Sequence, residues 1–422
     1  MSNRPTNPTV STAARRFRQA CAALVVAALC TTALSFASTS AAPPTTDPAT
    51  AGEYAAGWLA GQLDADIPLI NFGSPDWGVT LDAAISLAAT GTGATQLDAV
   101  WAALVADRDT VVDPFSSGDQ PGRLARVILL AHALGESPTA VGTAPGDDLV
   151  ARLLATLSPS GLFGDPTTLS PTYDGTFRQS YSIAALVAAG EAVPSSATQW
   201  LLDQQCADGS WMPFRAEASP GVLEACAFDS AAFVGPDTNS TAAAINGLDA
   251  AGVGATEIDD AAAWLATVQN ADGGWGLFPG DASEPSSTGL TWQALAGAGF
   301  GTAAEFLDGS ATPLQTLLSF QLGCTSPAGE RGALTYPGSN DAPNTFSTAQ
   351  ATPALAGVPL VFGPVTAADS VPVVDCSVPT TTTTTVPPGS TVLPTPTTAP
   401  APSASPASAA AGTTARPISF VG

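Results

Sequence analysis

The chain has no lysine and a single histidine, His132, and its other cationic side chains are 12 arginines. The lack of a second histidine excludes any metal or catalytic site that needs two. Asp and Glu together number 36, so the formal net charge is −24. A field of this sign disfavours binding to nucleic acid and to anionic membrane surfaces. The sequence therefore predicts no metal site, no cofactor and no nucleic-acid partner.

Long apolar runs are also scarce. One lies between Ala20 and Ala33; Arg15, Arg16 and Arg18 stand just before it and small residues follow it. This order is typical of a secretory signal peptide, which we predict over residues 1–42. No other run approaches the roughly 20 apolar residues that cross a bilayer. The sequence predicts a secreted protein, or one associated with the cell surface, that is not an integral membrane protein.

Removing the predicted signal peptide makes the chain more acidic. Four of the 12 arginines lie within it, which leaves eight arginines against 36 acidic residues and a net charge of −28. At the other end, residues 377–422 consist mostly of Thr, Pro, Ser and Ala. Such a composition buries too little apolar surface to fold, so it predicts a disordered stalk.

Residues 51–376 contain a repeat of two helices, which predicts an all-α domain. The second helix of each unit is rich in alanine and ends at a glycine, which suits a left-handed helix C-cap. These helices are apolar on nearly every side, so we expect them to be buried as an inner ring. Their predicted ranges are 80–90, 123–134, 178–189, 240–251, 287–298 and 347–356.

The first helix of each unit is more polar and should form an outer ring. Six such hairpins cannot bury their apolar faces singly, so they stack, either as an open solenoid or as a closed toroid. The residues that mark the outer helices are Trp58, Trp101, Leu153, Trp200, Trp264 and Leu317.

Two turns between the helices share one pattern of Gln, Asp, Gly and Trp. In it, Gln should cap a helix end, Asp-Gly should form a tight turn, and Trp should pack on the neighbouring hairpin. The pattern resembles the repeats of squalene–hopene cyclases and of prenyltransferase β subunits. This resemblance implies closure into an α/α toroid, and cobalamin-carrier toroids share the same fold. The residues concerned are Gln204, Asp208, Gly209 and Trp211, and Gln269, Asp272, Gly273 and Trp275.

The resemblance also implies where a catalytic acid would stand. Class II terpene cyclases protonate their substrate with the central Asp of an Asp-x-Asp-Asp-Thr-Ala segment. The matching stretch here runs from Asp237 to Ala242 and has Asn239 at the donor position. An amide cannot supply the proton that a carbocation cascade needs. Asp237 remains as a catalytic candidate, with helix N-cap as its alternative role.

Four cysteines lie beyond the signal peptide: Cys206, Cys226, Cys324 and Cys376. An even number in an exported protein indicates disulfides, and four cysteines allow three pairings. We expect Cys206 to pair with Cys226 across one loop. Cys324 and Cys376 would then tie the last repeat to the stretch that follows it.

Three arginines fall near the start of neighbouring inner helices. Arg123 and Arg178 occupy equivalent positions, and Arg126 lies one turn further on. They predict a site for an anionic group, with ion pairs to local acids such as Asp113, Asp119 or Asp174 as the alternative. The inner-ring aromatics predict an apolar ligand, with core packing as their alternative role. These aromatics are Tyr181, Trp292 and Phe346.

Three functions remain open. The first is a non-catalytic module that binds a small apolar or anionic ligand, or a cell-surface protein. The second is a divergent enzyme that acts on an isoprenoid. The third is a polysaccharide-acting enzyme, which would need two opposed carboxylates. The candidates for such a pair are Asp76, Asp174, Asp229 and Glu284.

Overall fold

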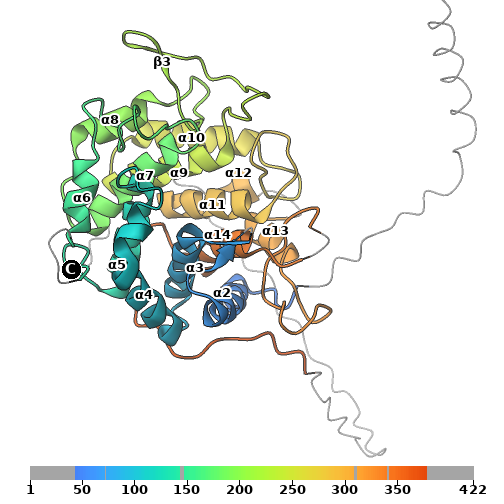
Figure 1. Cartoon of the computed structure of the whole chain (residues 1–422). Helices are drawn as coiled ribbons and strands as arrows, with labels where there is room; N and C mark the ends of the chain where they lie inside the picture. Colours follow the sequence, from blue (N-terminus) through green and yellow to red (C-terminus); the bar gives the residue numbers. More distant parts are fainter. Residues whose placement is uncertain (1–42, 72, 143–146, 308–310, 340–341, 378–422) are drawn as a thin grey trace, which may run out of the picture. The chain divides into compact units, whose positions relative to one another are not determined.

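The computed structural model describes residues 43–71, 73–142, 147–307, 311–339 and 342–377. By its internal contacts the chain divides into two units, residues 1–376 and 377–422. The predicted signal peptide, and the predicted stalk apart from Ser377, lie outside the described residues. All described helices and strands belong to the first unit (Figure 1).

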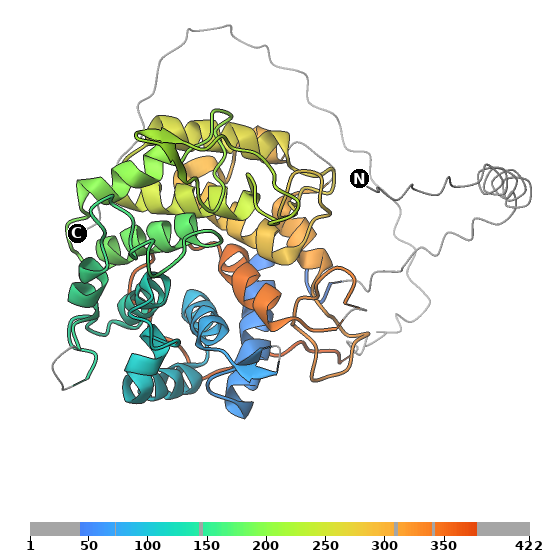
Figure 2. The same cartoon turned by 45° about the horizontal axis from the view of Figure 1, so that its top comes forward.

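Six helices of this unit form a closed ring. Each contacts the next along the sequence, and the last, α14, also contacts the first, α3. Figures 1 and 2 show α14 beside α3 although they lie at opposite ends of the repeat region. This contact confirms the predicted α/α toroid and excludes the open solenoid. The inner helices are α3 (Trp77–Thr90), α5 (Pro121–Leu134), α7 (Gly175–Ala188), α9 (Thr238–Ala251), α11 (Pro285–Leu295) and α14 (Thr345–Ala356).

The outer helices alternate with the inner ones along the chain, as predicted. They are α2 (Pro48–Ala65), α4 (Ala94–Val112), α6 (Leu149–Ala155), α8 (Ser195–Asp203), α10 (Ala255–Thr267), the short α12 (Ala304–Leu307) and α13 (Pro313–Ser319). A π-helical turn, η1 (Ala296–Phe300), extends α11. Two small hairpins lie in loops of the described chain. They pair β1 (Ile70–Asn71) with β2 (Ser74–Pro75), and β3 (Glu217–Ser219) with β4 (Val222–Leu223).

Small residues allow the inner helices to touch through their backbones. A Cβ on Gly247 of α9 would lie 2.8 Å from the Cα of Ser180 in α7. A Cβ on Gly289 of α11 would lie 2.7 Å from the Cα of Ala351 in α14. Because real Cβ atoms do not approach other atoms this closely, larger side chains here would push the ring apart.

A threonine joins the preceding turn to the inner helix in four repeats. Thr241 of α9 accepts a hydrogen bond from the backbone N–H of Trp211 at 2.9 Å. The N–H of Asp237, four residues before that threonine, donates back to the carbonyl of Trp211 at 3.0 Å. Equivalent threonine bonds join Leu69 to Thr80, Trp275 to Thr288 and Leu334 to Thr348. These bonds satisfy backbone groups that the packing of the turn removes from water.

A glutamine joins each of three turns to the following outer helix. The side-chain amide of Gln269 donates to the carbonyls of Gly273 and Phe306. Gln205 does the same with Gly209 and Glu257, so Gln205, rather than Gln204, is the equivalent of Gln269. The third such residue binds the first outer helix and so helps to close the ring. It is Gln321, which donates to the carbonyls of Gly332 and Ala51.

A glycine with positive φ stands where each of four turns meets the next outer helix. Gly273 has a φ of 85°, and a Cβ there would lie 2.5 Å from the carbonyl oxygen of Ala311. In the other three turns a Cβ would likewise overlap a backbone carbonyl. These pairs are Gly161 with Ser196, Gly209 with Asp260, and Gly332 with Tyr54.

The segment after α14, residues 358–376, forms a strap along the C-terminal ends of the inner helices. The N–H of Val365 donates to the carbonyl of Ala133, at the end of α5. The N–H of Ala368 donates to the carbonyl of Gly91, at the end of α3. The strap ends at the Cys324–Cys376 disulfide, and the second disulfide joins Cys206 to Cys226. Both predicted pairings are present in the structure.

The glycine contacts predict a position-dependent effect of alanine. Gly273→Ala should lower the free energy of unfolding by about 2–4 kcal/mol, because it adds overlap to an unfavourable φ. Gly280 has a similar φ of 88° with open space around it. Gly280→Ala should therefore cost only about 1–2 kcal/mol. Denaturant unfolding measures both, and equal losses would contradict the steric explanation.

The two disulfides close loops of different length, with sequence separations of 20 and 52. In the chain-entropy description, replacing both cysteines of a pair with serine should cost roughly 3 kcal/mol for the shorter loop and 4 kcal/mol for the longer. We expect the Cys324–Cys376 variant to be the less stable of the two in urea. Peptide mapping without reduction checks the pairing independently, and a Cys206–Cys324 peptide would refute it.

Candidate functional site

The inner helices begin at one end of the ring, here called the mouth, because an outer helix returns the chain between them. Four of their N-caps use a side chain to accept backbone N–H groups. Asp76 caps α3, Glu284 caps α11 and Asn344 caps α14. Asp237 caps α9, accepting from the N–H of Ser240 at 2.6 Å and from its hydroxyl at 2.8 Å. The three acids among these caps complement the positive ends of the inner-helix dipoles.

Asp237 is the acid that the sequence left as a catalytic candidate. It is buried, at 3% exposure. Burial raises its pKa to about 7, although bonds from the N–H and hydroxyl of Ser240 and from the N–H of Asn239 act in the opposite direction. Each of its oxygens accepts a hydrogen bond from Ser240. The carboxyl group therefore serves the cap of its own helix.

Two of the three predicted arginines, Arg126 and Arg178, approach the same point at the mouth, and Arg123 lies toward α3. A Cβ on Gly122 would lie within 4 Å of side-chain atoms of both Arg126 and Arg178. Each arginine is ion-paired: Arg123 with Asp76 at 3.3 Å, Arg126 with Asp82 at 2.8 Å, and Arg178 with Asp174. Of the three acids named as alternative partners, only Asp174 pairs with one of them; Asp119 binds Arg152.

The remaining arginines of the described chain are also engaged. Arg108 and Arg152 pair with aspartates. Arg215 and Arg331 donate to backbone carbonyls. An anionic ligand at the mouth would therefore have to compete with carboxylates that already hold the arginines.

The centre of the ring holds a cavity of about 30 Å³. Tyr181 lines it, and the guanidinium of Arg126 lies 5.1 Å from the centre of the Tyr181 ring. Burial raises the pKa of Tyr181 to about 12, outweighing the charge of Arg126. Trp292 is buried and Phe346 is 44% exposed, and neither lines the cavity. A space of this size holds about one water molecule.

The carboxylates proposed for a polysaccharide-acting enzyme each have a local partner. Asp76 and Asp174 pair with arginines, and Glu284 caps α11. Asp229 accepts from the N–H of Ala231 in its own loop.

His132 lies in the last turn of α5, where burial lowers its pKa. Within the described ranges, no three His, Cys, Asp or Glu side chains are grouped so as to hold a metal ion.

A larger recess lies outside the ring, beside α8. This groove has a volume of about 820 Å³. One wall comes from the loop after α6 and the other from the β3–β4 hairpin. The apolar side chains that line it are Leu162, Pro166, Trp200, Phe214, Val222 and Leu223.

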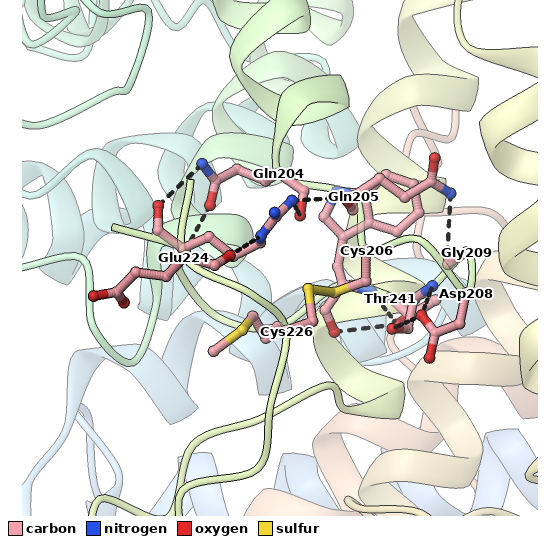
Figure 3. The surroundings of a disulfide bond; sticks show 12 residues. Gln204, Gln205, Cys206, Asp208, Gly209, Glu224, Cys226 and Thr241 are labelled. Carbon is pink, nitrogen blue, oxygen red and sulfur yellow. Dashed lines mark hydrogen bonds between the residues drawn. A yellow bond between two sulfur atoms is a disulfide. The ribbon is translucent and has the colours of Figure 1, made fainter. Parts of the chain in front are cut away.

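The hairpin wall of the groove is fixed at its base. The Gln204 side chain accepts from the N–H of Arg215 at 2.6 Å. Arg215 donates to the carbonyls of Gln205 and Glu224 at 2.7 and 2.9 Å, across the two ends of the hairpin. The Cys206–Cys226 disulfide lies beside these bonds (Figure 3). Within the groove, the Trp200 and Phe214 rings stack with centroids 6.3 Å apart.

Sequence patterns did not predict this groove. The hairpin belongs to the long insertion between Trp211 and α9, which follows neither the helical repeat nor its turn pattern. The one available signal was the pair of cysteines that bounds it. Gln204, which we assigned to the repeat turn, instead anchors this insertion.

Known structures support the fold class. No protein-family profile matches the chain, and no curated protein is similar to it in sequence. A crystal structure of a protein from Actinoplanes is similar at a TM-score of 0.52 and 18% identity, over 74% of this chain and 99% of that one. Together with the closed ring of helices, this likeness identifies an α/α toroid.

Two terpene cyclases are more distant. The type II terpene cyclase MstE from Scytonema has a TM-score of 0.38 and 16% identity, covering 72% of this chain and 87% of that one. The ent-copalyl diphosphate synthase from Streptomyces platensis has a TM-score of 0.38 and 18% identity. That match covers 72% of this chain and 49% of the synthase, so this chain spans about half its length.

None of the described helices combines the length and the apolar character needed to span a membrane.

The burial of Asp237 predicts how stability depends on pH. Because its pKa is raised in the folded state, the unfolding free energy should fall as the pH rises from about 4 to about 7, by about 1.4 kcal/mol for each pH unit in that interval. Asp237→Asn should remove this dependence, so the variant should gain stability relative to wild type between about pH 4 and pH 8. Denaturant unfolding across this range measures it.

Asp76→Asn is the matched control, because it alters the cap of α3. Burial opposes ionisation of Asp76, but Asn71, the N–H of Gly78 and the charge of Arg123 together hold its pKa below the ordinary value. The contribution of the Asp76 carboxylate to the free energy of unfolding should therefore be fully present above about pH 4, and be lost only in more acidic solution. If Asp237→Asn and Asp76→Asn gave the same pH profile, the raised pKa of Asp237 would be refuted.

Proposed function

We propose that this chain is a secreted or cell-surface toroid that binds a ligand in the groove beside α8 and catalyses no cyclisation. The observation that carries the proposal is the contrast in volume between this groove and the cavity at the ring centre. Ligand sites usually enclose about 300–1,000 Å³. The groove, at about 820 Å³, falls in this range, whereas the central cavity, at about 30 Å³, does not.

The side chains that fill the ring centre support this proposal. Arg126, Asp82 and Tyr181 interact with one another there. A bound isoprenoid would have to displace this ion pair into apolar surroundings, which is costly for charged groups. Asn239 at the donor position, and the use of Asp237 as a helix cap, agree with the loss of cyclase chemistry.

The groove favours an elongated apolar ligand. Six apolar side chains line it, and the polar groups among its lining residues include Asp203 and Glu217. The one cation among them, Arg215, donates its hydrogen bonds to backbone carbonyls of the hairpin base. We therefore propose that the groove binds an apolar molecule, or the apolar side chains of a peptide, and that this ligand has no anionic group.

Export agrees with the two disulfides, because such bonds persist in oxidising compartments. Our proposed organisation keeps the boundaries predicted from the sequence. Residues 1–42 are a signal peptide, residues 51–376 the toroid and residues 377–422 a stalk.

A second candidate is a divergent isoprenoid enzyme. The buried Asp237, with its pKa raised to about 7, favours it, because such a carboxyl group is partly protonated near neutral pH. Asp237 does not line the central cavity, however. This activity would therefore require the mouth to open before a substrate could reach the acid.

Groove binding can be tested by native mass spectrometry of the protein purified from a host that secretes it. We expect a bound molecule that is lost in Val222→Arg, because Val222 lines the groove and is 55% exposed. The control Val253→Arg alters an exposed valine outside the groove, and should keep the bound molecule. A bound mass retained in both variants would place the ligand elsewhere.

The absence of cyclase chemistry is tested separately. Purified protein incubated with squalene or geranylgeranyl diphosphate should yield no cyclised product by gas chromatography. The variant Asn239→Asp with Ser240→Asp restores the acidic segment. It should still be inactive, because the ring centre has no room for the isoprenoid chain of the substrate. If wild type cyclises either substrate and Asp237→Asn abolishes this turnover, the enzyme hypothesis is correct.

A further inference from the structure

Three phenylalanines form an exposed cluster beside the start of α9. Phe228 and Phe233 belong to the insertion before α9, and Phe278 belongs to the turn before α11. Phe278 is half-buried and contacts both other rings, with centroids 4.8 and 4.9 Å away at steep angles. Phe228 and Phe233 are 54% and 62% exposed. None of the three residues lines the groove beside α8.

The backbone holds Phe233 in an unfavourable conformation. Its φ is 55°, a region that bulky side chains rarely adopt. A tight loop enforces it, because Asp229 and Val234 exchange backbone hydrogen bonds and the Asp229 carboxylate accepts from Ala231. In this conformation the Phe233 ring is exposed to water. Strain of this kind concentrates at functional sites.

The surroundings of the cluster are anionic. Asp229 and Asp281 are exposed, and Asp281 accepts a hydrogen bond from the N–H of Phe278 at 3.2 Å. The charge of Asp281 also acts on Tyr336, whose pKa is raised by burial and then by the charges of Glu284 and Asp281. Every arginine of the described chain has a partner other than these acids, and the chain has no lysine.

We propose that Phe228, Phe233 and Phe278, with Asp229 and Asp281, form a docking surface for an arginine-bearing, cationic segment of another protein. A guanidinium stacks on an aromatic face and pairs with carboxylates, so both features of the surface favour the same side chain. The nearby Cys206–Cys226 disulfide and the packing of the three phenylalanine side chains fix the surface in advance, which lowers the entropy lost on binding.

The test uses the whole secreted chain and a blocked peptide of alternating arginine and glycine, with calorimetry at physiological salt (about 150 mM). Wild type should bind this peptide more tightly than the lysine counterpart. Phe233→Gly removes the ring and relieves the unfavourable φ. It should weaken binding about three- to fivefold while leaving the melting temperature equal or higher. Asparagine also tolerates this φ, so Phe233→Asn should have the same effects on peptide binding and on the melting temperature.

Phe115→Ser is the matched control, because Phe115 is 76% exposed in another repeat. It should leave peptide binding unchanged. Equal effects of Phe115→Ser and Phe233→Gly would assign binding to the general acidic field and overturn the proposal. A lowered melting temperature of Phe233→Gly with unchanged peptide binding would also overturn the proposal, because Phe233 would then have only a structural role. Binding of neutral cellohexaose that Phe233→Gly abolishes would replace the protein partner with a glycan.

Discussion

The toroid depends on the hydrogen bonds between each turn and the inner helix that follows it. A turn buried between helices must satisfy its backbone groups, and a threonine one helical turn beyond the N-cap does this in four repeats. Once the turn is fixed, a glutamine can reach the next outer helix, and a glycine can lie against its backbone. Repeats built in this way close the ring, in which α14 contacts α3.

The sequence predicted the helices well because each repeat carries its own boundaries. Alanine-rich segments ending at glycine identify inner helices, whatever happens elsewhere in the chain. The assignment of Gln204 to the repeat turn was wrong. Gln205 stands three residues before Asp208, as Gln269 stands before Asp272, so the spacing already indicated Gln205, and its bonds to Gly209 and Glu257 confirm the repeat role.

The candidate site was harder to predict, because it depends on contacts across the ring and on a segment outside the repeat. Equivalent positions place the three arginines near the starts of the neighbouring helices α5 and α7. Arg123 and Arg126 pair with Asp76 and Asp82, which joins α5 to the neighbouring α3, and spacing along the chain does not reveal this. The groove and the phenylalanine cluster both involve the insertion before α9, where no periodicity applies. The volume of the groove and the exposure of the phenylalanines can be known only from the folded structure.

The strap has a consequence for how the ring comes apart. Open repeat arrays lose structure progressively from their ends, since a terminal repeat has only one neighbour. Here the terminal repeats contact each other, and the strap runs on from the last repeat to the ends of α3 and α5. The Cys324–Cys376 bond makes α14 and the strap one covalent loop. Because every repeat of the ring has two neighbours, we expect the repeats to lose their structure together, in one cooperative transition.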